Sequence, residues 1–251
     1  MGRLEEAEEA REQSLAAWES VNTALPASIT LGRGLTHYRL GELLHHTGRI
    51  EDARRQFDLA QAIMEDLASR RPNESVCHWQ LICLLANCPD PELRNPPRAV
   101  DLAKRVLPQQ AGHYWRYLAL AQYRNEQWQE AADSIQQAMD LRQGGDAFDW
   151  LLLAMTHWQL GQKDRAIQRY AQAQEAINIG KPLFYEYLGV MAVERLQSEA
   201  EMLLDAQAED AAEGGNTEYS VLKAARAVPQ RDQIPADSSQ RLSLGLRDGC
   251  R

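Results

Sequence analysis

The spacing of apolar residues repeats itself in the second half of the chain. Residues 149–173 align without gaps on residues 114–138, and apolar or small side chains fall at the same places in both windows. In each window a Trp-x-x-Leu-Ala stretch precedes a short polar break, and an Ala-x-x-x-(Ile/Tyr)-x-x-Ala stretch follows it. Both stretches place these residues on one face of a helix. Each window therefore predicts two helices joined by a tight turn.

The same template occurs twice more toward the N-terminus. Residues 37–60 carry it, with Gly48 in the turn and Phe57 in the second helix. Residues 76–107 form a looser copy, in which the turn is enlarged by the stretch NCPDPELRNPP. Its prolines prevent one continuous helix. The chain therefore predicts four helical hairpins built on one pattern.

Neither helix of such a pair can bury its apolar face alone, so the pairs are expected to stack. The expected fold class is all-α, a solenoid of helical hairpins over residues 1–204 that ends in a capping helix. Residues 205–251 have mixed charge and little periodicity, and are expected to be mostly disordered. The expected units of the array are a half repeat at 2–22, repeats at 36–72, 75–108, 112–142 and 147–178, and the capping helix at 183–204.

The chain begins in the middle of such a unit. Residues 2–7, GRLEEA, match residues 48–53, GRIEDA, in residue type. Since Gly48 is expected in a turn, the first helix corresponds to the second helix of a repeat. A late start in a longer reading frame, or a clipped fragment, is favoured over a natural cap, although the glutamates supply a polar face of the kind a cap needs. The unpaired face of this helix predicts self-association.

Composition narrows the function classes. The chain has 251 residues, of which 44% are apolar and 25% charged, as in ordinary soluble proteins. A net charge of −9 provides no basic field for nucleic acid. No apolar run has the length of a membrane span, and the acidic N-terminus is unlike a secretory signal. Four cysteines without paired spacing favour a reducing, cytoplasmic location.

No catalytic motif stands out. The Gly-rich loop, the His-Arg-Asp and the Asp-Phe-Gly of protein kinases are absent from the sequence, and neither glycine pair precedes a Walker lysine. His45 and His46 are adjacent, and adjacent helical side chains diverge by about 100°, which disfavours a shared metal ion. The glutamates among residues 5–9 are better explained by a solvated helix face. We therefore expect no enzymatic activity, no metal and no cofactor.

The repeated pattern resembles the tetratricopeptide repeat, whose signature is W-x2-L-G-x2-Y followed by A-x3-F, A and P. Leu44, Gln122 and His157 stand where that signature has Tyr, and His37 where it has Trp. The stretch GGDAFDWLLLAMTHWQLGQKDRA is also similar to arrays carried C-terminally by serine/threonine kinases of planctomycete bacteria. The matching residues in the two clearest repeats are Trp115, Leu118, Ala119, Ala131, Ala138, Trp150, Leu153, Ala154, Gly161, Ala166, Tyr170 and Ala173.

This resemblance implies a non-catalytic scaffold that binds a protein or peptide segment in a concave groove lined by the first helix of each repeat. The alternative is a regulatory C-terminal part of a longer serine/threonine kinase. The asparagines and lysines of a carboxylate clamp are missing, so apolar burial would hold the partner, and Arg116 and His113 would orient it. Whether the strip at 148–158 is exposed or covered by the following helix stays open. The expected groove residues are Tyr38, Glu42, Leu84, His113, Arg116, Leu120, Tyr123, Phe148, Leu151, Met155 and Trp158.

Overall fold

The computed structural model describes residues 2–19, 27–72, 74–106, 112–179 and 190–205. Within these ranges the chain forms ten α-helices, one short 3-10 helix and no β-strand, which confirms the all-α class. The 3-10 helix, η1, spans Pro91–Leu93 between α4 and α5. The α-helices are α1 (Gly2–Glu19), α2 (Ala27–His46), α3 (Ile50–Arg70), α4 (Ser75–Asn87), α5 (Pro96–Val106), α6 (Gly112–Arg124), α7 (Trp128–Leu141), α8 (Ala147–Gln159), α9 (Lys163–Asn178) and α10 (Val190–Asp205).

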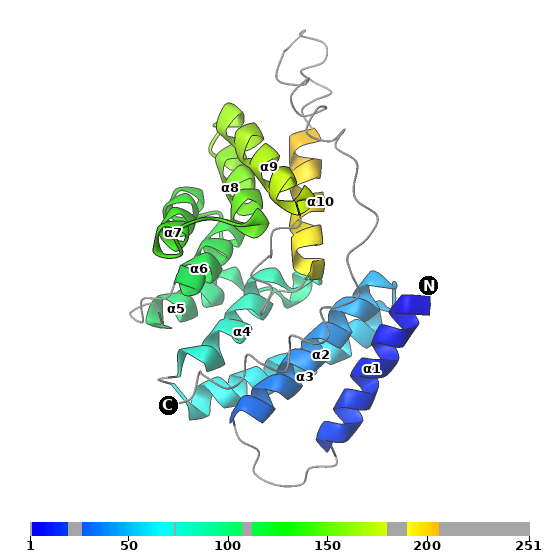
Figure 1. The fold of residues 1–251 in the computed structure, drawn as a ribbon. Helices are drawn as coiled ribbons and strands as arrows, with labels where there is room; N and C mark the ends of the chain where they lie inside the picture. Colours follow the sequence, from blue (N-terminus) through cyan, green and yellow to red (C-terminus); the bar gives the residue numbers. More distant parts are fainter. Residues whose placement is uncertain (1, 20–26, 73, 107–111, 180–189, 206–251) are drawn as a thin grey trace.

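Eight of these helices pair into hairpins that follow one another along the chain (Figure 1). Helix α2 packs on α3, α4 on α5, α6 on α7 and α8 on α9. Contacts of α3 with α4, α5 with α6, and α7 with α8 join neighbouring hairpins. Helix α1 packs on α2 and buries Leu15, and a salt bridge joins its Glu8 to Arg49 at the start of α3. One apolar core therefore runs through the stack.

Three of the four hairpin turns share one backbone geometry. In each, an N–H just after the turn donates to a carbonyl five residues earlier, with an N to O distance of 2.9 Å. The turn residue has a positive φ, which is 82° at Gly48, 59° at Glu126 and 71° at Gly161. Such a helix-ending turn favours glycine because a side chain crowds the left-handed backbone. The short polar breaks of the sequence therefore correspond to one repeated turn.

The turn between α4 and α5 is longer and is held by side chains. The Asp90 carboxylate accepts from the backbone N–H of Glu92 and from Arg54 Nε of α3. Arg94 Nε donates to the carbonyl of Cys88 at 2.6 Å. The backbone N–H of Asn95 donates to the Leu85 carbonyl at 2.8 Å. The proline-rich stretch thus forms an ordered turn between two separate helices.

The second helix of each clear repeat buries one large side chain at an equivalent position. These are Phe57, Ile135 and Tyr170, and each has 0% of its surface exposed. Gly41 lies opposite Phe57, and a β-carbon added to it would stand 2.5 Å from the ring. A residue without a side chain is needed there because the two helices approach closely. The apolar periodicity of the sequence thus marks the faces that meet in the core.

The start of one helix differs from expectation. Helix α2 begins at Ala27, before the expected repeat start at 36, because no proline interrupts residues 27–46 and Pro26 directly precedes them. The described part of the expected capping helix at 183–204 is α10, Val190–Asp205. Residues 183–189 and nearly all of the expected tail at 205–251 lie outside the described residues.

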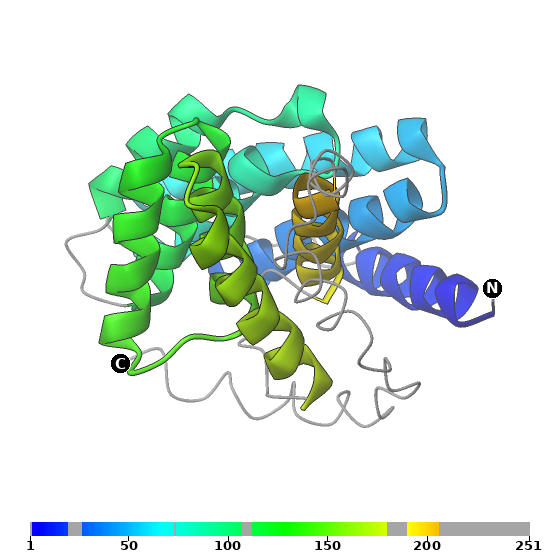
Figure 2. The same ribbon diagram turned by 90° about the horizontal axis from the view of Figure 1, so that it is seen from above.

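Helix α10 lies against the first helices of the hairpins (Figures 1 and 2). Seen from above, it stands among the other helices instead of extending the stack at its end (Figure 2). We call the surface formed by α2, α4, α6 and α8 the inner face. Among the described helices none has the length and apolar character to cross a membrane.

Candidate functional site

The apolar residues expected to line an open groove are buried. Phe148, Leu151 and Met155 of α8 are at most 2% exposed, and Leu84 and Leu120 are equally closed. The expected groove residues of this strip are therefore not open to a partner in the structure. Helix α10 packs on α8, and neighbouring first helices pack on one another, which removes this surface from water. Of the two possibilities left open by the sequence, the structure has the covered strip.

Trp158, another expected groove residue, lies at the margin of this packing. Trp158 is half-buried, and the Lys163 ammonium lies 5.4 Å from its ring centroid. His113 belongs to α6, but its side chain is not among those that the structure describes.

Arg116 does not face a partner either, because it is enclosed between α6 and α8. Its Nε donates to Asp149 Oδ1 at 2.9 Å and its Nη2 to Asp146 Oδ2 at 2.7 Å. Its guanidinium also lies 5.1 Å from the ring centroid of Phe148. This corrects the expectation that Arg116 orients a partner. We call Arg116, Arg142, Asp146 and Asp149 the junction cluster.

The junction cluster is also the N-terminal cap of α8. The Asp146 carboxylate accepts from the backbone N–H groups of Phe148 and Asp149, and the Asp149 carboxylate accepts from the N–H of Asp146. This reciprocal capping box satisfies backbone donors that a helix start leaves free. Arg142 Nη2 donates to Asp149 Oδ2 at 2.7 Å, which adds a second cation. The start of α8 and the ion pairs of the junction cluster thus form one structural unit.

Burial and pairing act against each other in this cluster. Burial opposes the charged form of Arg116, but Asp149 and Asp146 outweigh it and raise the pKa of Arg116. Burial likewise opposes ionisation of Asp146, but Arg116 lowers the pKa of Asp146 below its ordinary value. For the more deeply enclosed Asp149, burial prevails and raises the pKa. The cluster therefore depends on all its members being present.

The inner face holds a second set of charges, directed at α10. Arg195 Nη1 donates to Glu42 Oε1 of α2 at 2.9 Å, and Arg195 Nη2 donates to the Asn87 carbonyl of α4 at 3.2 Å. The Tyr38 hydroxyl donates to the same carbonyl at 3.5 Å. Burial opposes the charge of Arg195, but Tyr38 and Glu42 outweigh it and raise the pKa of Arg195. Two of the expected groove residues therefore hold a side chain of the chain's own helix.

One helical turn further along α10, an acid meets a base of the inner face. Both oxygens of Glu199 accept from Arg124 of α6, and the Nη2 to Oε2 distance is 2.7 Å. Arg124 Nη2 also donates to Asn87 Oδ1 at 3.2 Å, and its guanidinium lies 5.5 Å from the Tyr123 ring centroid. Burial and the nearby Glu199 raise the pKa of Tyr123 to about 12. We call Tyr38, Glu42, Asn87, Tyr123 and Arg124 the α10 seat.

An apolar stripe of α10 completes the contact. Val193, Leu196, Ala200 and Leu204 are buried, and their spacing places them along one side of the helix. At the far end of the helix, Glu201 Oε1 accepts from the Tyr170 hydroxyl of α9 at 2.8 Å. Helix α10 is therefore bound as an amphipathic helix, with charges beside an apolar stripe.

Helix α10 does not use every group of its seat. Arg124 Nε and Asn87 Nδ2 are buried and have no hydrogen-bond partner among the described residues. A recess of about 490 Å³ opens beside the helix, between its Ser198 and Met202 and the side chains of His45 and Arg94. Buried donors without partners cost about 1–3 kcal/mol each. The inner face therefore has room and hydrogen-bonding capacity that α10 leaves unfilled.

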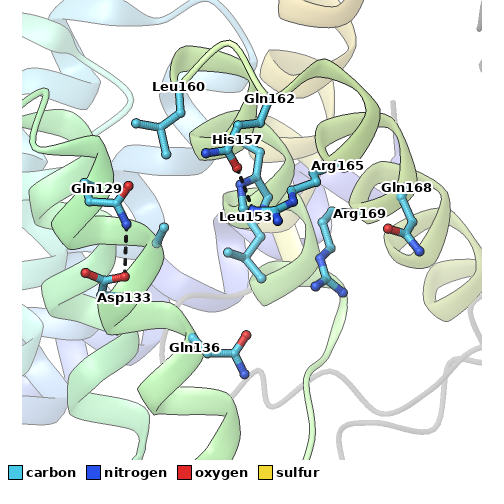
Figure 3. Close-up of a pocket in the computed structure, with 11 residues that line it drawn as sticks. Gln129, Asp133, Gln136, Leu153, His157, Leu160, Gln162, Arg165, Gln168 and Arg169 are labelled. Atoms are coloured by element: carbon cyan, nitrogen blue, oxygen red, sulfur yellow. Dashed lines mark hydrogen bonds between the residues drawn. The ribbon is translucent and has the colours of Figure 1, made fainter.

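A second hollow of about 500 Å³ lies between α7 and α9, and its lining is polar (Figure 3). Gln129 donates to Asp133 there, and the Arg169 guanidinium lies 5.1 Å from the Trp150 ring centroid. His157 reaches this hollow from α8, and burial lowers its pKa. Arg165 donates to Gln162 in the same hollow, and no Ser, Thr or Cys stands among its described lining residues to act as a nucleophile beside a base.

The three cysteines in the described part of the chain are closed off from solvent. Cys77, Cys83 and Cys88 are buried free thiols. Burial raises the pKa of Cys77 to about 11 and that of Cys88 to about 12, so neither is a thiolate near neutral pH. Among the residues that the structure describes, no three His, Cys, Asp or Glu side chains are grouped to hold a metal ion.

Comparison with known proteins adds no family. No family model, no curated protein and no solved structure matches the chain. The likeness to tetratricopeptide repeats therefore rests on the residues quoted above.

The sequence analysis did not identify the charged residues that join α10 to the inner face. These are Arg124, Arg195 and Glu199. A signal was present in VERLQSEAEMLL, where a base and an acid four residues apart flank an apolar stripe.

Proposed function

We propose that this chain is a non-catalytic protein-binding scaffold, a tetratricopeptide-type solenoid whose inner face takes an amphipathic helix of a partner protein. One observation carries the proposal. The inner face already holds one such helix, α10, through a buried apolar stripe and hydrogen-bonded charges drawn from α2, α4 and α6. Helix-in-groove recognition uses the same elements between separate chains.

Several features favour a helix over an extended peptide as the ligand. The contacts to α10 come from side chains three and four residues apart, which only a helix brings onto one side. The surface offers deep positions for aliphatic side chains and charged positions beside them, in the manner of other helix-binding grooves.

The proposals on catalysis, cellular compartment and kinase association rest on the sequence. The sequence motifs for catalysis are missing, so we propose a binding role, in a reducing, cytoplasmic compartment that suits the free cysteines. A regulatory role within a longer kinase rests on the resemblance alone. No structural observation favours it over a scaffold that acts by itself.

The test measures binding of a helix in trans. A fluorescent peptide with the sequence of residues 190–205 is titrated into the full chain and into a full-length Leu196→Asp variant, in which a charge replaces a fully buried leucine of α10. We expect the variant to bind the peptide at least about tenfold more tightly, because the attached α10 no longer competes. Fluorescence anisotropy gives the affinities, and hydrogen exchange locates protection on the inner face.

The matched control is the same peptide with Asp in place of Leu196 and Leu204, which is expected not to bind. Full-length Leu204→Asp is the second variant, in case Leu196→Asp fails to fold by circular dichroism. The proposal fails if a folded variant, with α10 exchanging freely, binds no more of the original peptide than of the control.

A further inference from the structure

The charges of the α10 seat are separated along the inner face. Glu42, from α2, forms a salt bridge with a base, and 0% of its side chain is exposed. Arg124, from α6, forms a salt bridge with an acid, and 11% of its side chain is exposed. Along α10 these contacts fall four residues apart, which is about one helical turn. The inner face therefore presents an acid and then a base to any helix that runs in the direction of α10.

We propose that the inner face recognises a partner helix by the order of its charges, with a base placed toward α2 and α4 and an acid one turn later placed toward α6. This inference rests on the proposed function and deepens it, since it makes Glu42 and Arg124 the residues that set specificity. The partner is an amphipathic helix of another protein, with an apolar stripe spaced as Val193, Leu196, Ala200 and Leu204 are in α10.

The position occupied by Arg195 rejects an acid. Two acceptors meet there, the Glu42 carboxylate and the Asn87 carbonyl, and both residues are 1% exposed. A carboxylate in this place would face the desolvated carboxylate of Glu42, whose other oxygen accepts from Arg39 Nη1 at 2.6 Å, and the carbonyl of Asn87. Like charges brought together at a desolvated interface cost several kcal/mol. This end of the seat therefore discriminates by charge sign.

The position occupied by Glu199 rejects a base for the converse reason. Arg124 contacts both carboxylate oxygens, a fork geometry that suits only an acid. Arg94 lies nearby, and burial together with the charges of Arg124 and Arg195 disfavours its protonated form and lowers its pKa. A second or third cation at this place would add to that repulsion.

The charge order also favours binding of a free helix to the seat. On a free helix, an Arg four residues before a Glu is the weaker order of an intrahelical ion pair. In the structure Arg195 and Glu199 bind different partners, Glu42 and Arg124. A helix with this order therefore gives up little internal pairing when its charges separate onto the seat.

The occupant is a different protein's helix and not α10 of a second copy. Each copy already holds its own α10, and an identical helix brings nothing that the attached one lacks. The unused donors Arg124 Nε and Asn87 Nδ2 and the recess beside Ser198 leave room for a helix that fits better than α10 does. Such a helix shares the stripe and charge order of α10 and adds acceptors beside the acid.

The experiment uses the full-length Leu196→Asp chain and two peptides of equal composition. One has the sequence of residues 190–205, and in the other Arg195 and Glu199 are exchanged for Glu and Arg. We expect the exchanged peptide to bind at least about tenfold more weakly. If both peptides bind equally, the charge order is irrelevant and this inference fails, while the proposed function stands. If neither binds, the proposed function itself fails.

A second arm needs only the attached helix and works even where the loosened variant does not fold. Hydrogen exchange of α10 is compared in the full chain with Glu199→Arg, with Arg124→Glu, and with both substitutions. We expect each single substitution to speed α10 exchange at least about tenfold, and the double substitution to restore most of the protection. Failure of the double variant to recover contradicts a charge-specific contact.

Two controls complete this arm. Glu194→Arg makes the same charge change at an exposed position of α10 and is expected to leave exchange of the helix within about twofold of the unmodified chain. Light scattering then tests whether the helix bound to the inner face comes from a second copy of the chain or from another protein. A dimer of the unmodified chain that Glu199→Arg abolishes would assign the inner face to a second copy and overturn our choice of partner.

Discussion

The chain contains two sets of Arg–carboxylate contacts that use the same chemistry in different settings. In the junction cluster all partners belong to α6, the end of α7 and the start of α8, and their bonds also cap α8. In the α10 seat the partners come from helices far apart in sequence, and buried donors remain unused. The first set leaves no such donor unused, whereas the second does so beside the helix it holds. The binding role that we propose therefore rests on this unused capacity and not on the ion pairs alone.

The largest expected effect breaks the junction cluster. In Arg116→Ala, Asp146 and Asp149 lose their common partner while staying buried, and unpaired buried charges cost about 3–5 kcal/mol. We expect a loss of this size in the free energy of unfolding, measured in urea. A loss below about 1 kcal/mol would show that Arg142 and water replace Arg116, and that the cluster is not closed.

The next effect concerns the apolar part of the α10 contact. Leu196 is fully buried, and Leu196→Ala is expected to cost about 2–4 kcal/mol in the stability of that contact. Hydrogen exchange should show the loss in α10 and on the inner face while α6 and α7 keep their protection. Equal loosening of every helix would mean that α10 belongs to the core as firmly as the hairpins do.

A smaller effect is expected for the charged part of the same contact. Glu199 is partly exposed, so Glu199→Gln is expected to lower global stability by no more than about 1 kcal/mol. Faster exchange should nevertheless appear in α10, because Arg124 loses its charged acceptor. If urea unfolding shows a loss as large as that of Arg116→Ala, the two sets of charges do not differ in the way described.

The smallest effect is a dependence on pH beside the α10 seat. Burial lowers the pKa of His45, with Arg195 and Arg94 contributing, although Asp90 acts in the opposite direction. The stability contributed by neutral His45 is therefore present above its ordinary pKa of about 6.5 and is lost as the pH falls through the lowered value. Burial lowers the pKa of His157 as well, so both act in the same direction.

We expect the urea concentration at the midpoint of unfolding to decrease when the pH is lowered from 7.5 to 5.5. The decrease should be smaller in His45→Gln. His46→Gln serves as the control because His46 is the exposed neighbour. An identical decrease in His45→Gln and the unmodified chain would locate the effect elsewhere, with His157→Gln as the next variant to measure.

The sequence by itself determined the local structure. Periodic small and large residues led to the helices, and the polar breaks with Gly48 and Gly161 led to the turns, because spacing along a helix and left-handed turn residues act over a few positions. It also placed Phe57, Ile135 and Tyr170 on the buried faces, since an apolar face must meet another one wherever the chain goes.

Only the tertiary structure decided what covers the inner face. Leu151 and Met155 have the same pattern whether a partner, a neighbouring helix or α10 packs on them, so the sequence left both possibilities open. The sequence led us to expect that Arg116 orients a bound partner. Its true acceptors, Asp146 and Asp149, could not be identified because they lie thirty or more residues away and belong to the next hairpin. Periodicity specifies which side of a helix is buried, but the identity of the opposite surface and the pairing of charges depend on distances that exist only after the chain has folded.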